Sequence, residues 1–136
     1  GEQKEYSKTT AFFSNGRSHV SLNGGSDEHP NDAFTINIYN TIAAPLKSGD
    51  TFSVREDLNS PKNVPACYVG YSIDFLAYYF YGSWIAEQND RAIYPCEVYL
   101  TEVTDDYVKG TFSATVRERF GTKTRKMTNG TFYVER

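Results

Sequence analysis

The chain has 136 residues and a formal charge of -3, with a sequence pI of about 5.4, and its length suits one domain with its own core. The acidic balance argues against a protein that binds nucleic acid through a broad basic face. Aromatic residues make up 15% of the chain, and no stretch of 18 consecutive apolar residues exists, which excludes a transmembrane helix.

The N-terminal third contains more turn signals than strand signals. Residues 1–10 read either as the start of the domain or as the remnant of a disordered tether. Clusters of Asn, Gly, Ser and Asp at 14–17 and 22–32 predict loops on either side of a short strand that includes His19. The segment at 40–47 contains Pro45, which would break a helix, so we expect a loop or one helical turn there.

Alternation of apolar and polar residues dominates the rest of the chain. This period of two predicts strands with one buried and one wetted face, as in antiparallel sheets. About eight short strands, separated by frequent turn signals, favour an all-β single domain over 1–136, built as an antiparallel β-sandwich or a partly open, lipocalin-like barrel. The residues expected to point inward are Phe34, Ile36, Ile38, Phe52, Val54, Cys96, Val98, Leu100, Val108, Gly110, Phe112, Ala114, Val116, Phe132 and Val134.

A Gly-Thr-Phe triplet occurs twice near the C-terminus, at 110–112 and 130–132. Each glycine stands where a strand begins or bends, and would permit a bulge or a close backbone approach. The threonine is then expected to face solvent and the phenylalanine to face the core. Turn signals around these segments predict a three-stranded antiparallel meander, with strands near 94–103, 107–119 and 126–136.

The C-terminal pattern resembles a group of small all-β lipoprotein domains of unknown function from Bacteroides-type bacteria. The resemblance covers residues 33–136, and its distinctive part is the last 30 residues. The matching residues are Val108, Gly110, Thr111 and Phe112, followed by Thr128, Gly130, Phe132 and Val134. The resemblance implies export to the periplasm or outer-membrane surface, with a lipidated cysteine upstream of Gly1 as the only membrane anchor. It implies no activity and no catalytic residues.

The most ligand-like feature is the aromatic stretch at 68–91. We expect one long strand over 68–81 that is apolar on both faces. Such a strand is either a central strand covered on both sides or an aromatic platform that stacks on a glycan or another small ligand. The residues predicted to line this platform and its mouth are Tyr78, Tyr79, Tyr81, Trp84, Gln88, Asn89 and Arg91.

The chain has two cysteines, Cys67 and Cys96, which form either a disulfide or two buried free thiols. If strand 68–81 paired with strand 93–101, Cys96 would lie opposite a residue near position 78 and far from Cys67. That register argues against a bridge, unless the strand order differs or the two cysteines meet between sheets.

The sequence gives only weak signals for a metal site, an anion site or a catalytic site. His29 lies among Asp27, Glu28 and Asp32, but the spacing matches no calcium loop, so we interpret the segment as an acidic loop. A basic cluster at 117–126 reads as a solvated hairpin loop. No nucleophile motif is present, and the carboxylate pairs at 56–57 and 105–106 read as structural.

We therefore assign no catalytic residue, metal or cofactor, and predict a non-enzymatic envelope protein that binds a glycan, a small molecule or a protein. The alternative is a purely structural or adhesion module.

Overall fold

The computed structural model describes residues 5, 8–14, 18–25, 27, 32–40, 44–53, 65–73, 79–82, 84–87, 90–118 and 123–135, and over 71–93 and at 14 and 118 it describes the backbone alone. Within these ranges the chain forms strands and no helix. The strands are β1 (Lys8–Ser14), β2 (His19–Gly25), β3 (Ala33–Tyr39), β4 (Thr51–Ser53), β5 (Ala66–Ile73), β6 (Tyr79–Gly82), β7 (Trp84–Glu87), β8 (Asp90–Ile93), β9 (Cys96–Val103), β10 (Tyr107–Glu118) and β11 (Thr124–Glu135). No helix of the described ranges is long and apolar enough to span a membrane.

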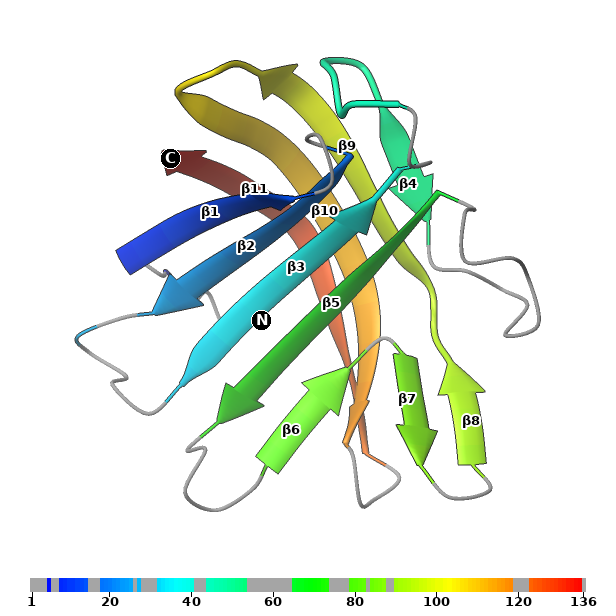
Figure 1. Ribbon diagram of the computed structural model, residues 1–136. Helices are drawn as coiled ribbons and strands as arrows, with labels where there is room; N and C mark the ends of the chain where they lie inside the picture. Colours follow the sequence, from blue (N-terminus) through cyan, green and yellow to red (C-terminus); the bar gives the residue numbers. More distant parts are fainter. Residues whose placement is uncertain are drawn as a thin grey trace.

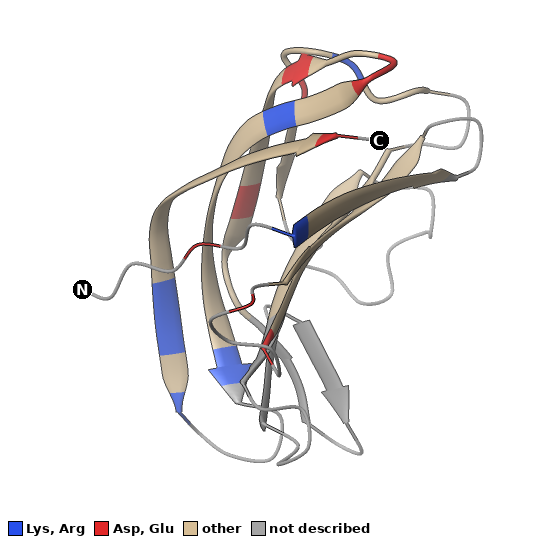
Figure 2. Ribbon diagram, turned by 90° about the vertical axis from the view of Figure 1, so that its left-hand side faces the viewer, with Lys and Arg blue, Asp and Glu red and all other residues tan. Residues whose placement is uncertain are grey.

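The strands form an antiparallel sandwich, which confirms the predicted all-β class. Eight strands follow one hydrogen-bonded path in the order β1-β2-β3-β5-β6-β10-β9-β4, while β11 pairs with β10 and the hairpin β7-β8 stands apart. Figure 1 shows β1, β2, β3 and β5 side by side in front of β9, β10 and β11, and the side view in Figure 2 shows the two layers facing each other. We call these layers the N-terminal sheet and the C-terminal sheet.

Strand β10 joins the two layers. Along one edge, its residues 108–114 pair with β9, whereas Arg117 and Glu118 pair with Gly82 and Tyr81 of β6. Its opposite edge pairs with β11. One strand therefore belongs to the C-terminal sheet at its start and reaches the N-terminal sheet at its end, so the sandwich is a continuous sheet that doubles back on itself.

The core lies between the layers and has the composition that the alternation predicts. Ile36 and Ile38 of the N-terminal sheet are 1% and 0% exposed, and Leu100 and Val108 of the C-terminal sheet are both 0% exposed. The rings of Phe34 and Phe112 meet across the layers, with 5.3 Å between their centroids. Every inward residue predicted above is buried or partly buried, apart from Val54, which lies outside the described residues.

The C-terminal meander is also confirmed, because β10 pairs antiparallel with both β9 and β11. Its two Gly-Thr-Phe triplets pair reciprocally: Gly110 lies opposite Phe132, and Phe112 lies opposite Gly130. A Cβ atom added at either glycine would overlap the ring of the opposing phenylalanine. Each triplet therefore supplies a space for the ring of the other, which explains why the same three residues occur twice.

The turn between β9 and β10 is held by Thr104. Its backbone amide donates to the carbonyl of Tyr107 with an N···O distance of 2.9 Å, and its hydroxyl accepts from the amides of Asp106 and Tyr107, both at 3.1 Å. A side-chain oxygen that accepts from the next amides is a common way for threonine to close a tight turn. Asp105 and Asp106 thus occupy a turn, as the sequence predicts.

The strand pattern differs from expectation in the N-terminal third. Residues 8–10 belong to β1, not to a tether, and residues 22–25 extend β2 instead of forming a loop. Near the C-terminus, Arg125 likewise lies in β11 and not in a hairpin loop. In each case hydrogen bonds to a neighbouring strand extend the element, because pairing satisfies the backbone groups along the whole ladder.

Strands β5 and β9 do not pair, which corrects the predicted register around the cysteines. β5 pairs with β3 and β6, and β9 pairs with β10 and β4. The two strands instead face each other across the core, and Cys67 and Cys96 are buried, adjacent thiols that are not joined by a disulfide. The prediction assumed that strands close in sequence would pair, whereas the doubled-over sheet places them in opposite layers.

Candidate ligand-binding faces

The predicted aromatic strand is two strands. β5 ends at Ile73 and pairs antiparallel with β6, so the expected continuous strand over 68–81 is wrong. Between Tyr71 and Tyr81 the stretch contains no Gly, Pro or Asn, and its turn-favouring residues are Ser72 and Asp74 alone, which is a weak turn signal. We expected about eight strands, and the described residues contain more because β6, β7 and β8 are four-residue strands in this region.

The structure describes only part of the predicted aromatic platform. Tyr78, Gln88 and Asn89 lie outside the described residues. The other four have described backbones, and their ladder partners are Ile73 for Tyr79, Tyr71 for Tyr81, Ile93 for Trp84 and Ala86 for Arg91. Tyr79 and Tyr81 thus lie on β6, whereas Trp84 and Arg91 lie on the separate β7-β8 hairpin. The platform itself stays a prediction.

A second aromatic face lies on the outside of the C-terminal sheet, where the side chain of Tyr99 is 46% exposed. Val98 and Leu100 enter the core on either side of it, so the alternation of β9 forces Tyr99 outward. Cross-strand pairing continues from Tyr99 to Thr51 on β4, to Thr111 on β10 and from there to Thr131 on β11. One tyrosine and three exposed threonines therefore form a row across four strands.

This row lies in a shallow, open depression of about 480 Å³. We call it the Tyr99 face, and its described lining residues are Thr51, Glu97, Tyr99, Thr111, Phe112, Ser113, Asn129, Gly130 and Thr131. Glu97 is the one charged side chain among them, and it pairs across the ladder with Ser53 and Ser113. The lining thus combines an aromatic ring with hydroxyl, amide and carboxylate groups.

A β-bulge shapes one side of the Tyr99 face. The register between β10 and β11 shifts between Phe112 and Ala114, so Ser113 stands opposite two residues of β11. One of them, Asn129, has a φ of 54° and is the one non-glycine residue with positive φ among those described. Asparagine tolerates this left-handed conformation better than most residues, at a cost of roughly 1 kcal/mol. Bulges and residues with such backbone angles concentrate at functional sites, where they redirect side chains.

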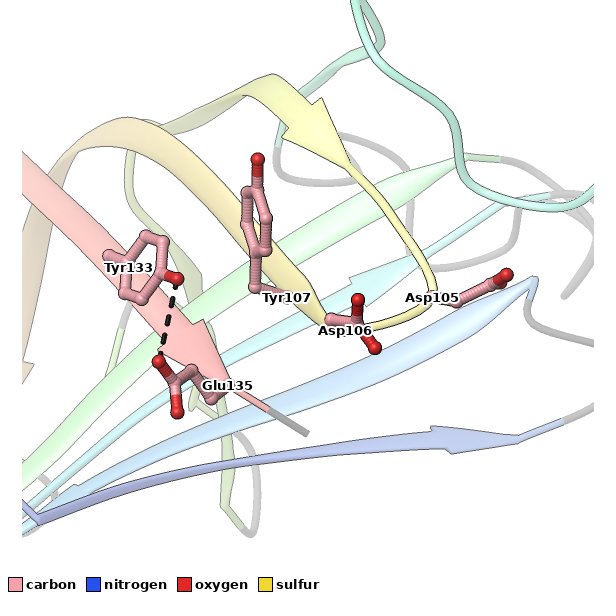
Figure 3. Close-up of a pocket in the computed structure, with 5 residues that line it drawn as sticks. All are labelled: Asp105, Asp106, Tyr107, Tyr133 and Glu135. Carbon is pink, nitrogen blue, oxygen red and sulfur yellow. Dashed lines mark hydrogen bonds between the residues drawn. The ribbon is translucent and has the colours of Figure 1, made fainter.

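A second depression, of about 580 Å³, lies at the β9-β10 turn and is lined by Asp105, Asp106, Tyr107, Tyr133 and Glu135. The two tyrosine rings stack with 5.0 Å between their centroids, and the Tyr133 hydroxyl donates to Glu135 at 3.5 Å (Figure 3). Figure 3 also shows the aspartates standing on the turn beside the rings.

The tyrosines of this second depression keep their protons. A hydrogen bond from its hydroxyl to Glu102, with further contributions from desolvation and from that carboxylate's charge, raises the pKa of Tyr107 to about 12. Desolvation and the neighbouring Glu135 raise the pKa of Tyr133 as well. Both phenols are therefore neutral hydrogen-bond donors at physiological pH.

The titratable side chains that line the two depressions are carboxylates and tyrosines. Their described lining residues include no histidine or cysteine. Of the two histidines, His19 lies on β2 and meets the ring of Tyr39 edge-on at 4.7 Å, and His29 lies outside the described residues. In the described ranges no group of three or more His, Cys, Asp or Glu residues could hold a metal ion. What the Tyr99 face offers is ring stacking and hydrogen bonding.

Sequence reasoning missed the Tyr99 face although its signal was present. The alternation of β9 puts Glu97, Tyr99 and Thr101 on the face away from the core. Nothing local in the sequence shows that Thr51, from a strand more than forty residues earlier, joins the same row. Comparison of the chain with protein-family models, with curated proteins and with solved structures gives no match.

Proposed function

We propose that this protein is a non-catalytic binding domain that presents the Tyr99 face to a neutral glycan. The observation that carries the proposal is the row of Thr51, Tyr99, Thr111 and Thr131, which combines a half-exposed aromatic ring with three hydroxyl groups on adjacent strands. The C–H face of a sugar ring packs on an aromatic ring, and its hydroxyls exchange hydrogen bonds with side chains at the periphery.

The chemistry of the lining favours a neutral glycan over other ligands. An anionic ligand would need a cation, and the described lining residues include no lysine or arginine. A lipid or drug-like molecule needs an enclosed apolar cavity that buries most of its surface, whereas the Tyr99 face is open to solvent. A sugar chain lying across strands needs only a shallow, extended surface.

Binding assays with neutral polysaccharides test this proposal. Isothermal titration calorimetry against soluble β-glucan, xylan and mannan should detect binding of at least one of them. The Tyr99→Ala variant should lose about tenfold or more in affinity, because the stacking ring is gone. Tyr133→Ala is the matched control, since Tyr133 is 52% exposed but lies in the other depression, and its affinity should equal that of the wild type.

Two outcomes would contradict the proposal. Binding that weakens steeply with added salt would indicate a charged ligand, because salt screens charge–charge attraction and leaves stacking largely unaffected. Binding of none of the polysaccharides, together with an unperturbed Tyr99→Ala fold, would favour the alternative, a structural or adhesion module that binds no small molecule.

The envelope setting is part of the same proposal. The resemblance to small all-β lipoprotein domains implies an exported domain, held to the periplasmic or outer-membrane surface by a lipid on an upstream cysteine. The lipocalin-like form of the fold and the aromatic platform around Trp84 also stay predictions. Because Trp84 is the one tryptophan of the chain, a shift of its fluorescence on addition of a polysaccharide would indicate binding at that second platform.

A further inference from the structure

The two cysteines of the chain meet in the middle of the core. Cys67 on β5 is 0% exposed and Cys96 at the start of β9 is 2% exposed. Their Sγ atoms lie 3.3 Å apart, and the Cys67 Sγ also lies 3.7 Å from the carbonyl oxygen of Cys96. The strands belong to different sheets, so this sulfur pair spans the interface between the two layers.

The separation is close to what a covalent bond requires. A disulfide has an S–S length of about 2.05 Å, so the sulfur atoms need to approach by roughly 1 Å, which small side-chain rotations can supply. Each cysteine is already held in a ladder: Cys67 pairs with Ile38 of β3, and Cys96 pairs with Ala114 of β10. The geometry is therefore prepared by the packing of the two sheets and not by the cysteines themselves.

We propose that Cys67 and Cys96 form an inter-sheet disulfide when the chain folds in the presence of a low-molecular-weight disulfide such as oxidised glutathione. One cysteine thiolate attacks the oxidant, forms a mixed disulfide and releases the first glutathione thiol. The second cysteine thiolate then attacks the protein sulfur and releases the second glutathione thiol. The two protein thiols lose two protons and two electrons in all. The oxidised glutathione takes up these protons and electrons and becomes two glutathione thiols.

Burial decides when this reaction takes place. The neighbouring Cys96 thiol and the loss of solvent both raise the pKa of Cys67 in the folded protein, which disfavours the thiolate that attacks the oxidant. An oxidant also has no access to two sulfur atoms that are 0% and 2% exposed. The first exchange step therefore occurs before the sheets close, and closure then brings the second sulfur into reach.

The bond would connect the two layers covalently at the point where Cys67 and Cys96 meet. It would close the chain segment from β5 to β9, which includes β6 and the β7-β8 hairpin. Closing a segment of about thirty residues restricts the unfolded chain, and in a domain of this size we expect the midpoint of thermal unfolding to rise by about 10 °C. This inference is independent of the ligand, because neither cysteine lines the Tyr99 face.

The test compares two refolding reactions of the wild-type protein. One portion is denatured and refolded with a mixture of oxidised and reduced glutathione, and the other with a thiol reductant. Each portion is then denatured again and alkylated with iodoacetamide, and its mass is measured by mass spectrometry. The oxidised portion should accept no alkyl groups and yield a cross-linked peptide containing Cys67 and Cys96, whereas the reduced portion should accept two.

A double variant, Cys67→Ala with Cys96→Ala, is the control for the thermal shift. Its midpoint of unfolding should be the same after both refolding reactions, while that of the wild type should be higher after the oxidising one. Two free thiols, glutathione adducts or disulfide-linked dimers after oxidative refolding would each overturn the proposal. The proposal would also be overturned if the oxidised wild-type protein folded and had the same midpoint of thermal unfolding as the reduced protein.

Discussion

The two sheets of the sandwich achieve their shape in different ways. In the N-terminal sheet, the ladders of β1 with β2, β2 with β3 and β3 with β5 run without any shift of register. In the C-terminal sheet, the register of β10 shifts once against β9 and once against β11. The shifts of register thus occur on β10, the strand that pairs with β9 in one layer and with β6 in the other.

The interruptions lie beside the glycines of the repeated triplet. The shift between β10 and β9 falls between Lys109 and Gly110, and the shift between β10 and β11 falls next to Phe112, whose ring occupies the space at Gly130. A glycine in a strand weakens the ladder locally and permits a close approach that other residues forbid. The comparison indicates that curvature in this protein depends on a few glycine positions, which mutation can test.

The largest effect is expected from Gly110→Ala. The new methyl group would overlap the carbonyl oxygen of Tyr99, a backbone atom that cannot rotate away, as well as the ring of Phe132. Overpacking of this kind costs roughly 1–3 kcal/mol, and we expect the upper part of that range because the backbone must shift. Urea denaturation measures the change in the free energy of unfolding.

Gly25→Ala is the matched control for that substitution. Gly25 also lies in a strand, but a Cβ there would meet only the carbonyl oxygen of Lys8, at an ordinary contact distance of 3.9 Å. We expect a change within about 0.5 kcal/mol. If Gly110→Ala and Gly25→Ala unfolded at the same urea concentration, the close approach at Gly110 would not be what shapes the C-terminal sheet.

A smaller effect of opposite sign is expected from Asn129→Gly. Glycine adopts the positive φ of this position without steric cost, so the variant should gain roughly 0.5 kcal/mol of stability in the same denaturation experiment. It should also bind the polysaccharide less tightly, because the amide leaves the Tyr99 face. Thr131→Gly, in the same strand but without positive φ, should instead lose stability. A destabilised Asn129→Gly would show that the asparagine side chain supports the bulge.

The smallest effect is a shift in the titration of Tyr107. Its folded-state pKa of about 12 lies above the usual value near 10, so the folded protein holds this proton more tightly than the unfolded chain does. The resulting stabilisation is complete below pH 10 and is lost as the pH rises toward 12, because the unfolded chain releases its proton first.

An ultraviolet titration of the folded protein measures this pKa as the difference between the wild type and Tyr107→Phe. Glu102→Gln should lower the pKa of Tyr107 toward its usual value, because the charged hydrogen-bond acceptor is gone. Asp105→Asn is a suitable control, since Asp105 is not among the principal causes of the shift. If the pKa of Tyr107 were unchanged in the Glu102→Gln variant, Glu102 would not be the cause of the raised pKa.

The sequence predicts those features of the fold that depend on interactions between residues close together in the chain. Alternation along Cys96–Leu100 and Val108–Val116 predicts the buried faces correctly, because the pleat of a strand imposes a period of two whatever its neighbours are. The meander is predictable for a similar reason, since short turns join strands that are adjacent in sequence. The repeated Gly-Thr-Phe triplet indicates a special backbone position, and its reciprocal pairing requires only the register of one hairpin.

Contacts between distant segments required the tertiary structure. The facing of Cys67 and Cys96, the row from Thr51 to Thr131 and the double role of β10 depend on which layer each strand enters, and no local pattern encodes that choice. Side-chain alternation is settled within a few residues, whereas the order of strands is settled by the burial of both inner faces at once. The amino-acid order thus determined which side chains are hidden, and only the folded sandwich decided which of them meet.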